Sequence, residues 1–301
     1  MIHSIDDLLK AARQGEPATL AVACAHDHDV LRAVAGARQE GIAQAVLVGK
    51  AGKICEILKE LGEEESHFTV VDAADDTDAA QKAVALVREG RAGFLMKGLL
   101  PTAELMRAVI DREKGLRTDR LISHVMMYEV PSYPKPLFLT DGGMNTYPDL
   151  EKKADILENA AQCLRALGYE QIYAACICGA EDVSPKIQAT VDAKALSEMT
   201  ARWRPYHMAV NGPMGLDLAI SRAACEHKHY GGEAGGRADI LLVPTYEVGN
   251  GIGKAMTYFG GARSAGIIVG ARAPIVLVSR ADTAETKLSS IALGCVVAQN
   301  Q

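Results

Sequence analysis

Short apolar runs that alternate with amphipathic helical patterns dominate the first third of this sequence. The runs are Thr19–Cys24, Ala45–Val48, His67–Val71 and Gly93–Met96, and a helical pattern follows each of them. Such short runs of aliphatic residues are typical of buried strands rather than helices. Four strand–helix units in a row predict a parallel sheet with right-handed crossovers and with helices on both faces. The expected fold class is therefore α/β.

The alternation breaks between Gly115 and Pro148. Two strand-like segments, Leu121–Tyr128 and Leu137–Thr140, flank a proline-rich stretch that cannot form a helix. The α/β pattern then returns, with further expected elements in this order: helix Asp149–Leu167, strand Ile172–Ile177, helix Lys186–Trp203, strand Met208–Asn211, helix Leu216–Glu226, strand Ile240–Val243, helix Gly251–Phe259, strands Ile267–Val269 and Ile275–Val278, and helix Ala284–Val297. At 301 residues the chain is long for one core, so two lobes are expected, with the passage between them at the break.

Composition narrows the classes of partner. The 38 acidic residues outnumber the 32 basic ones, which argues against a general nucleic-acid surface but leaves room for a local basic site. No apolar stretch approaches the roughly 20 residues needed to span a bilayer, and no signal-peptide pattern opens the chain. The seven cysteines are expected to be reduced and packed. We therefore expect a cytoplasmic protein that binds neither membrane nor nucleic acid.

The stretch from Ala238 to Arg280 suggests phosphate chemistry. Two apolar strands each lead to polar and basic residues: Asn250 and Lys254 after the first, and Ser279 and Arg280 after the second. In open α/β sheets, ligands bind beyond the carboxyl ends of strands. A glycine turn at a helix start, with Asn250 and Lys254 on one face, could bind an anion. The glycine spacing fits neither a dinucleotide fingerprint nor a P-loop, so a simple turn between strand and helix stays the alternative.

Other candidate residues have a structural alternative as well. Lys97 follows the strand Gly93–Met96, where it is either a ligand-binding residue or an ordinary surface lysine. Asp141 and Asn145 follow the strand Leu137–Thr140 and either bring a carboxylate and an amide to a ligand or cap a glycine turn. Ser279 or Asp282, with help from Thr283, could instead cap the closing helix.

Two histidine-rich tracts suggest a metal site only weakly. They are His26–Asp29 and Glu226–His229, and neither has a third ligand at a diagnostic spacing. The first lies where a helix cap is expected, and the second lies where a helix ends, a position that favours histidine and lysine. No metal site is predicted.

Seven segments in order make the chain resemble the phosphate acetyl/butyryltransferase family, and within it the phosphate butyryltransferases. These segments are Leu121–Val125, Phe138–Asn145, Gly212–Asp217, Gly235–Pro244, Gly249–Asn250 with Lys254, Ser264–Gly270 and Ser279–Asp282. The resemblance implies reversible transfer of an acyl group between CoA and inorganic phosphate, with CoA, acyl-CoA and acyl phosphate as substrates and no cofactor or metal.

The resemblance also implies an architecture and residue roles. It implies two lobes of the isocitrate/isopropylmalate dehydrogenase type, mostly parallel sheets flanked by helices, with the active-site cleft between the lobes. The first domain would comprise residues 1–117 plus 271–301, and the second residues 118–270. By the resemblance, Arg280 binds phosphate and Ser279 stabilises the transition state, with Lys97, Asp141, Asn145, Asn250, Lys254 and Asp282 as substrate-binding candidates. A homo-oligomer, in the simplest case a dimer, is expected.

The sequence departs from the acetyl-transferring branch at two places. Thr286 stands where that branch has an aspartate proposed as the base that deprotonates CoA, so the base is not assigned. Met256–Phe259 replaces a basic residue of that branch, which suggests a more apolar acyl pocket. The alternative function is a metal- and NAD-dependent dehydrogenase of the isocitrate type, although the aspartates are scattered. A phosphate- or CoA-binding protein without catalysis is a second alternative.

Overall fold

The chain folds into an α/β protein that divides into two compact units. The computed structural model describes residues 1–279 and 282–300. Unit 1 comprises Met1–Ser4 with Leu121–Ser264, and unit 2 comprises Ile5–Arg120 with Ala265–Gln301. Among the described residues, no helix is long and apolar enough to cross a membrane. The two units are described one at a time below.

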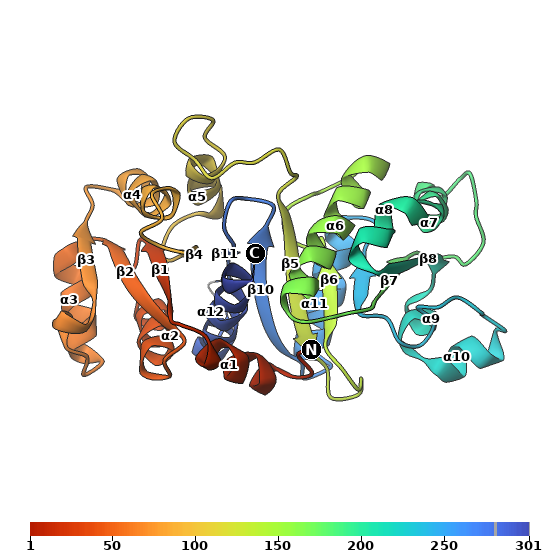
Figure 1. The fold of residues 1–301 in the computed structure, drawn as a ribbon, viewed down its shortest axis with the longest axis horizontal. Coiled ribbons are helices and arrows are strands. Elements are labelled where there is room, and N and C mark those ends of the chain that lie inside the picture. Colours follow the sequence, from red (N-terminus) through yellow and green to blue (C-terminus); the bar gives the residue numbers. More distant parts are fainter. Residues whose placement is uncertain (280–281, 301) are drawn as a thin grey trace. The chain divides into compact units, whose positions relative to one another are not determined.

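Unit 2 is built on a mostly parallel sheet with the strand order β3-β2-β1-β4-β11-β10 (Figure 1). The pairs between β1 and β2, β2 and β3, β1 and β4, and β4 and β11 are parallel, whereas β10 and β11 are antiparallel. The strands are β1 (Ala18–Ala23), β2 (Ala43–Gly49), β3 (Thr69–Asp72), β4 (Phe94–Lys97), β10 (Arg263–Val269) and β11 (Ile275–Val276). The four apolar runs of the first third are thus confirmed as neighbouring strands of one sheet.

Helices cover this sheet because their apolar faces match its buried strands. Helix α12 packs against both α1 and α2, and α4 packs against α5 and β1 (Figure 1). Helix α12 is buried along most of its length, which suits its apolar sequence from Ile291 to Val297. The helical elements are α1 (Ile5–Gln14), α2 (His28–Gln39), α3 (Ala51–Glu60), η1 (Glu65–His67), α4 (Asp76–Arg88), α5 (Thr102–Val109) and α12 (Ala284–Gln299).

The strands of unit 1 are hydrogen-bonded in the order β5-β6-β9-β7-β8. Strand β5 is antiparallel to β6, and the other neighbours are parallel. The strands are β5 (Ser123–Glu129), β6 (Leu137–Thr140), β7 (Ile172–Ile177), β8 (Met208–Met214) and β9 (Ile240–Leu242). The helical elements are α6 (Leu150–Ala166), α7 (Gln188–Glu198), α8 (Thr200–Trp203), η2 (Arg204–Tyr206), α9 (Leu216–Ile220), α10 (Arg222–His227) and α11 (Tyr246–Tyr258).

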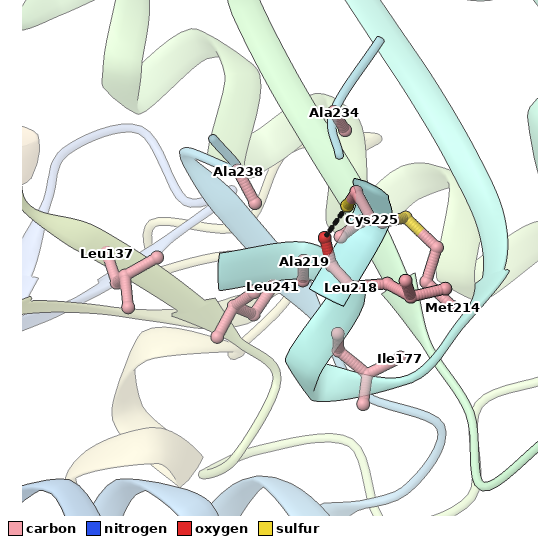
Figure 2. Close-up of a cluster of buried hydrophobic side chains, with 10 residues drawn as sticks. Leu137, Ile177, Met214, Leu218, Ala219, Cys225, Ala234, Ala238 and Leu241 are labelled. Carbon is pink, nitrogen blue, oxygen red and sulfur yellow. Dashed lines mark hydrogen bonds between the residues drawn. The ribbon is translucent and has the colours of Figure 1, made fainter. Parts of the chain in front are cut away.

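A core cluster fastens the short helices α9 and α10 to the sheet of unit 1. It joins side chains of β6, β7 and β9 to Leu218, Ala219 and Cys225 of the two helices (Figure 2). The Cys225 thiol donates to the Leu218 carbonyl oxygen at 3.1 Å, the contact drawn as a dashed line. Burial of these side chains compensates for helices too short to be stable alone.

Three expected helices differ from the structure. The predicted helix Lys186–Trp203 breaks at Met199, where the backbone has ψ of 43° and α7 gives way to α8. The predicted helix Leu216–Glu226 breaks at Ser221, whose side chain caps α10 by accepting from the Ala224 N–H. Helix α11 begins five residues before the predicted start at Gly251, a change that bears on the site below.

The unit boundaries lie close to the expected domain boundaries, with two differences. The chain passes between units after Arg120 and Ser264 rather than after residues 117 and 270, because Ile267 and Ile268 of β10 already pair with β11. Met1–Ser4 belong to unit 1 rather than to the first domain, since the Tyr169 hydroxyl donates to the Ile2 carbonyl oxygen at 2.9 Å.

Candidate active site

Lys97 lies at the carboxyl end of β4, as expected, but its side chain is buried. Its ammonium donates to the carbonyl oxygens of Gly98 at 3.1 Å and Leu100 at 3.3 Å, in the loop that follows the strand. A Cβ at position 98 would come within 2.2 Å of the Cys24 carbonyl oxygen, so only glycine fits there. Lys97 therefore stabilises this tight loop, and a contact with substrate stays a prediction.

Ser279 lies three residues beyond β11, which pairs in parallel with β4. The Ser279 N–H donates to the Asp282 Oδ2 atom at 2.7 Å, and the Asp282 N–H donates back to the Ser279 carbonyl oxygen at 3.1 Å. Ser279 is exposed and Asp282 is half-buried. These reciprocal bonds join the backbone of Ser279 to Asp282. Arg280, the predicted phosphate ligand, lies outside the described residues.

The cap of α12 is neither Ser279 nor Asp282. Thr283 is the N-cap, and its Oγ1 atom accepts from the Thr286 N–H at 3.2 Å. Thr283 has the extended backbone that an N-cap needs, and its hydroxyl reaches the N–H three residues on. Thr286, at the position of the family's proposed base, is thereby part of the cap, and its hydroxyl lies 3.2 Å from that of Thr283.

Asp141 follows β6 in unit 1, and its carboxylate is buried. Oδ1 accepts from the N–H groups of Gly143 and Met144, both at 2.8 Å. Oδ2 accepts from the His124 N–H at 3.1 Å and from the Asn145 side-chain amide at 2.6 Å. The carboxylate thus organises its own loop, although the sequence predicted it as a substrate ligand. That prediction is not tested by these contacts, which favour a structural role.

Asn250 and Lys254 lie inside α11, so the predicted glycine turn at a helix start is wrong. The helix begins at Tyr246, one turn before Asn250. Two of the three glycines in this part of the helix, Gly249 and Gly253, lie where neighbouring groups fill the space that a side chain would need. A Cβ at Gly249 would lie 2.7 Å from the Gly142 Cα atom, and one at Gly253 would lie 2.4 Å from the Tyr128 hydroxyl. Asn250 and Lys254 still share one face of the helix, four residues apart.

His124 is a residue of this region that the list of candidates missed. It stands in β5 beside the end of β6, and the Thr140 hydroxyl donates to its carbonyl oxygen at 2.8 Å. A Cβ at Gly143 would come within 2.4 Å of its Nδ1 atom, so the imidazole lies against the loop that Asp141 organises. The signal in the sequence was its place in Leu121–Val125, one of the segments that carry the family resemblance.

The histidine and cysteine candidates behave as structural residues. Asp27 caps α2 by accepting from the Val30 N–H at 2.9 Å. This confirms the prediction that the tract His26–Asp29 contains a helix cap. Burial lowers the pKa of His26, and the nearby Lys50 lowers it further. Burial, with Asp76 second, raises the pKa of the Cys24 thiol to about 12, so it stays protonated at neutral pH. Within residues 1–279 and 282–300, no group of three or more metal-ligating side chains comes together.

The candidates thus fall into two sets, one in each unit. Unit 2 carries Lys97 at the carboxyl end of β4, and Ser279 and Asp282 beyond the carboxyl end of the parallel strand β11. Unit 1 carries Asp141 and Asn145 beyond β6, and Asn250 and Lys254 on the helix that follows β9. The Val243 N–H donates to the Thr140 carbonyl oxygen at 2.9 Å, so β6 and β9 end side by side. Carboxyl ends of parallel strands are where α/β sheets bind ligands.

Known proteins match this chain over its whole length. Its sequence is 42% identical over 301 residues to phosphate butyryltransferase of Clostridium acetobutylicum, covering all of both chains. It is 40% identical to phosphate acetyltransferase of Rhizobium meliloti, covering 97% of this chain and 93% of the relative. The profile of the family described as phosphate acetyl/butaryl transferase matches residues 75–295.

Solved structures agree with these relatives. A branched-chain phosphotransacylase from Enterococcus faecalis V583 superposes with a TM-score of 0.85 at 33% identity, covering 94% of this chain and all of that one. A phosphotransacetylase from Streptococcus pyogenes shares the fold, with a TM-score of 0.83 at 18% identity over 99% of this chain and all of that one. The chain belongs to the phosphate acetyl/butaryl transferase family.

Proposed function

We propose that this enzyme transfers a short-chain acyl group reversibly between CoA and inorganic phosphate, with butyryl or a close homologue as the acyl group. The observation that carries the proposal is the 42% identity to a phosphate butyryltransferase along all 301 residues. Membership of the family makes the protein a phosphate acyltransferase, for which CoA and phosphate are substrates. The acyl group is the part that the proposal adds.

The proposed reaction needs orientation and charge stabilisation rather than a covalent enzyme intermediate. A phosphate oxygen attacks the thioester carbonyl carbon, and the carbonyl oxygen becomes an oxyanion. With the C–O bond to phosphate formed, the oxyanion collapses back to a carbonyl, the C–S bond breaks, and the CoA sulfur leaves as a thiolate that takes up the proton lost by the attacking phosphate. We assign the Ser279 hydroxyl to the oxyanion and Arg280 to the phosphate, because a preorganised donor and a guanidinium fork suit these groups. Binding both substrates together in the reacting orientation supplies the rest of the rate enhancement.

The end of α11 supports an acyl group longer than acetyl. Met256 packs against the apolar clusters of unit 1, while Tyr258 and Phe259 are 70% and 94% exposed. No basic side chain occupies Met256–Phe259, the stretch where the acetyl-transferring branch has one. Apolar surface favours additional methylene groups by about 0.8 kcal/mol for each one that is buried.

The test is a panel of acyl-CoA substrates. Acetyl-, propionyl-, butyryl- and isobutyryl-CoA are each incubated with phosphate, and both thiol release and acyl phosphate, trapped as its hydroxamate, are measured. We expect equal amounts of the two products and the highest kcat/KM with a four-carbon acyl group. Thiol release without acyl phosphate would identify a hydrolase, and no release with any substrate would identify a binding protein without catalysis.

Several finer expectations belong to the same proposal. The enzyme should need no metal and no cofactor, so turnover should persist in EDTA. Activity lost on chelation and restored by a divalent ion, together with NAD reduction, would revive the isocitrate-type dehydrogenase, which the relatives do not favour. The isocitrate-dehydrogenase-like arrangement with an interlobe active site, the homo-oligomer and the cytoplasmic location also stay predictions.

A further inference from the structure

The carboxylate of Asp141 has no hydrogen-bonding capacity left for a ligand. An ionised carboxylate offers about four acceptor positions. In Asp141 they are filled by three backbone N–H groups and by the amide of Asn145. The residue is 2% exposed, so solvent does not compete for these bonds. Its effect on any substrate must therefore pass through the groups that it holds.

Asn145 is the group through which Asp141 can act. The Nδ2 atom of Asn145 donates to the Asp141 carboxylate at 2.6 Å and to the Ile122 carbonyl oxygen at 3.0 Å. Both amide hydrogens are thereby used. The opposite orientation of the amide would turn its carbonyl oxygen against two acceptors, so the orientation is settled. Asn145 is half-buried, and only its Oδ1 atom, a hydrogen-bond acceptor, remains to meet a ligand.

The loop is also fixed in place by close backbone contact with α11. A Cβ at Gly142 would come within 2.9 Å of the Gly249 carbonyl carbon, and one at Gly249 within 2.7 Å of the Gly142 Cα atom. Asn250, the next residue of α11, belongs to the same candidate site. The Asp141–Asn145 loop is therefore a preformed part of the site in unit 1, with the orientation of one amide imposed by a buried negative charge.

We propose that Asp141 is a positioning residue that presents the Asn145 carbonyl oxygen to an N–H donor of the CoA substrate. This proposal rests on the proposed function. Of the two substrates, CoA carries uncharged amide N–H groups in its pantetheine arm, whereas phosphate is an anion with mostly acceptor oxygens. An acceptor oxygen backed by a buried carboxylate repels an anion and suits an uncharged donor. The loop thus serves CoA, and phosphate binds elsewhere.

The test compares the two substrates in Asn145→Ala. One lost hydrogen bond should raise the KM for acyl-CoA and the Kd for CoA about 3- to 10-fold. The KM for phosphate should stay within twofold. Asn211→Ala is the matched control: its carbonyl oxygen already accepts from the Ala234 N–H at 2.8 Å, so its loss should lower Tm and leave both KM values unchanged. A rise in the phosphate KM alone, or no change in either, would overturn the proposal.

A double-mutant cycle tests the action of Asp141 through Asn145. In Asp141→Asn the new amide can donate to Asn145, which should turn its carbonyl oxygen away from the substrate. The KM for acyl-CoA should rise at least as much as in Asn145→Ala, and the double variant should show no further rise. If the double variant instead shows a KM for acyl-CoA raised by the product of the two single effects, Asp141 does not act through Asn145 and the positioning role is overturned. If Asp141→Asn does not fold, the Asn145→Ala comparison still decides the substrate. Failure of the proposed function would show separately, as a wild-type enzyme without acyl-CoA turnover.

Discussion

Two carboxylates organise the two sets of candidate residues, one set in each unit, and they do so to different degrees. Asp141 in unit 1 is buried and accepts four hydrogen bonds, and its loop contacts a helix through paired glycines. Asp282 in unit 2 is half-buried, and its side chain accepts one described bond, from the Ser279 N–H. The first carboxylate fixes an entire loop, whereas the second fixes a single turn.

Under the proposed function, the difference predicts different roles for the two sets of residues. A rigid loop with a fixed amide suits recognition of a large substrate that keeps its shape throughout the reaction. The exposed hydroxyl of Ser279, on a residue that Asp282 holds by its backbone, suits a group that meets charge as it develops. Substitutions in the turn should therefore act on turnover, and substitutions around the loop should act on stability and on binding of CoA.

The largest effect is expected for Arg280→Ala. Loss of the guanidinium fork should lower kcat/KM by about 10³-fold and raise the KM for phosphate, because a charged paired donor is lost from the anion. Arg280→Lys should recover only part of the lost activity, since an ammonium group lacks the paired donors of the guanidinium. Steady-state kinetics with varied phosphate measures both effects. Arg91→Ala, which removes an exposed arginine, is the control, and near-normal kinetics of Arg280→Ala would remove the turn from the active site.

The substitution Ser279→Ala should lower activity somewhat less than Arg280→Ala does. Losing one donor to the oxyanion lowers kcat by about 10²-fold. The fold should be unchanged, because Thr283 rather than Ser279 caps α12 and because the Asp282 carboxylate bonds to the backbone of Ser279. Single-turnover rates and a thermal melt distinguish a catalytic role of the serine from a structural one. A variant that melts early with kcat intact would show that the serine is structural.

Most of the fold could be predicted from the sequence, because short aliphatic runs have few alternatives. The resemblance implies that residues 271–301, with the strand Ile275–Val278, belong to the first domain, and β11 does pair with β4 there. Helix α11 was misplaced because Gly249, Gly251 and Gly253 suggest a turn. Local propensity could not reveal that Gly142 and Tyr128 occupy the space beside two of these glycines.

The candidate site could be predicted in position but not in detail. Residues at strand ends can be found from the alternation of strands and helices: Lys97 is the last residue of β4, and Asp141 and Ser279 follow β6 and β11. The sequence cannot show whether a side chain is already used by the protein. A carboxylate after a strand, such as that of Asp141, gives the same sequence pattern whether or not four N–H groups of the protein bind it. Only tertiary structure brings those donors together.

A pair of glycine substitutions tests the rigidity of the unit 1 loop. Gly249→Ala places a Cβ against the Gly142 backbone and should destabilise the protein by about 1 to 3 kcal/mol. Gly251→Ala is the matched control in the same helix, with no atom within 4 Å, and should stabilise it by about 0.5 to 1 kcal/mol. Denaturant unfolding measures both. Equal effects of the two variants would mean that the loop and α11 are not in close contact.

The smallest effect concerns the single bond of the unit 2 turn. Asp282→Ala removes the acceptor of the Ser279 N–H and should lower kcat about tenfold, as expected for one charge-assisted bond that positions a catalytic group. Asp282→Asn keeps an acceptor oxygen and should recover part of the loss. The fold should persist, because Lys287 donates to the backbone carbonyl of Asp282 and not to its side chain. If Asp282 acts through Ser279, its removal should add little to the loss already seen in Ser279→Ala. If Asp282→Ala instead lowers kcat a further tenfold in the Ser279→Ala variant, the Asp282 carboxylate has a role of its own in the reaction. Asp282 and Asp141 would then differ in function and not only in the number of hydrogen bonds that each accepts.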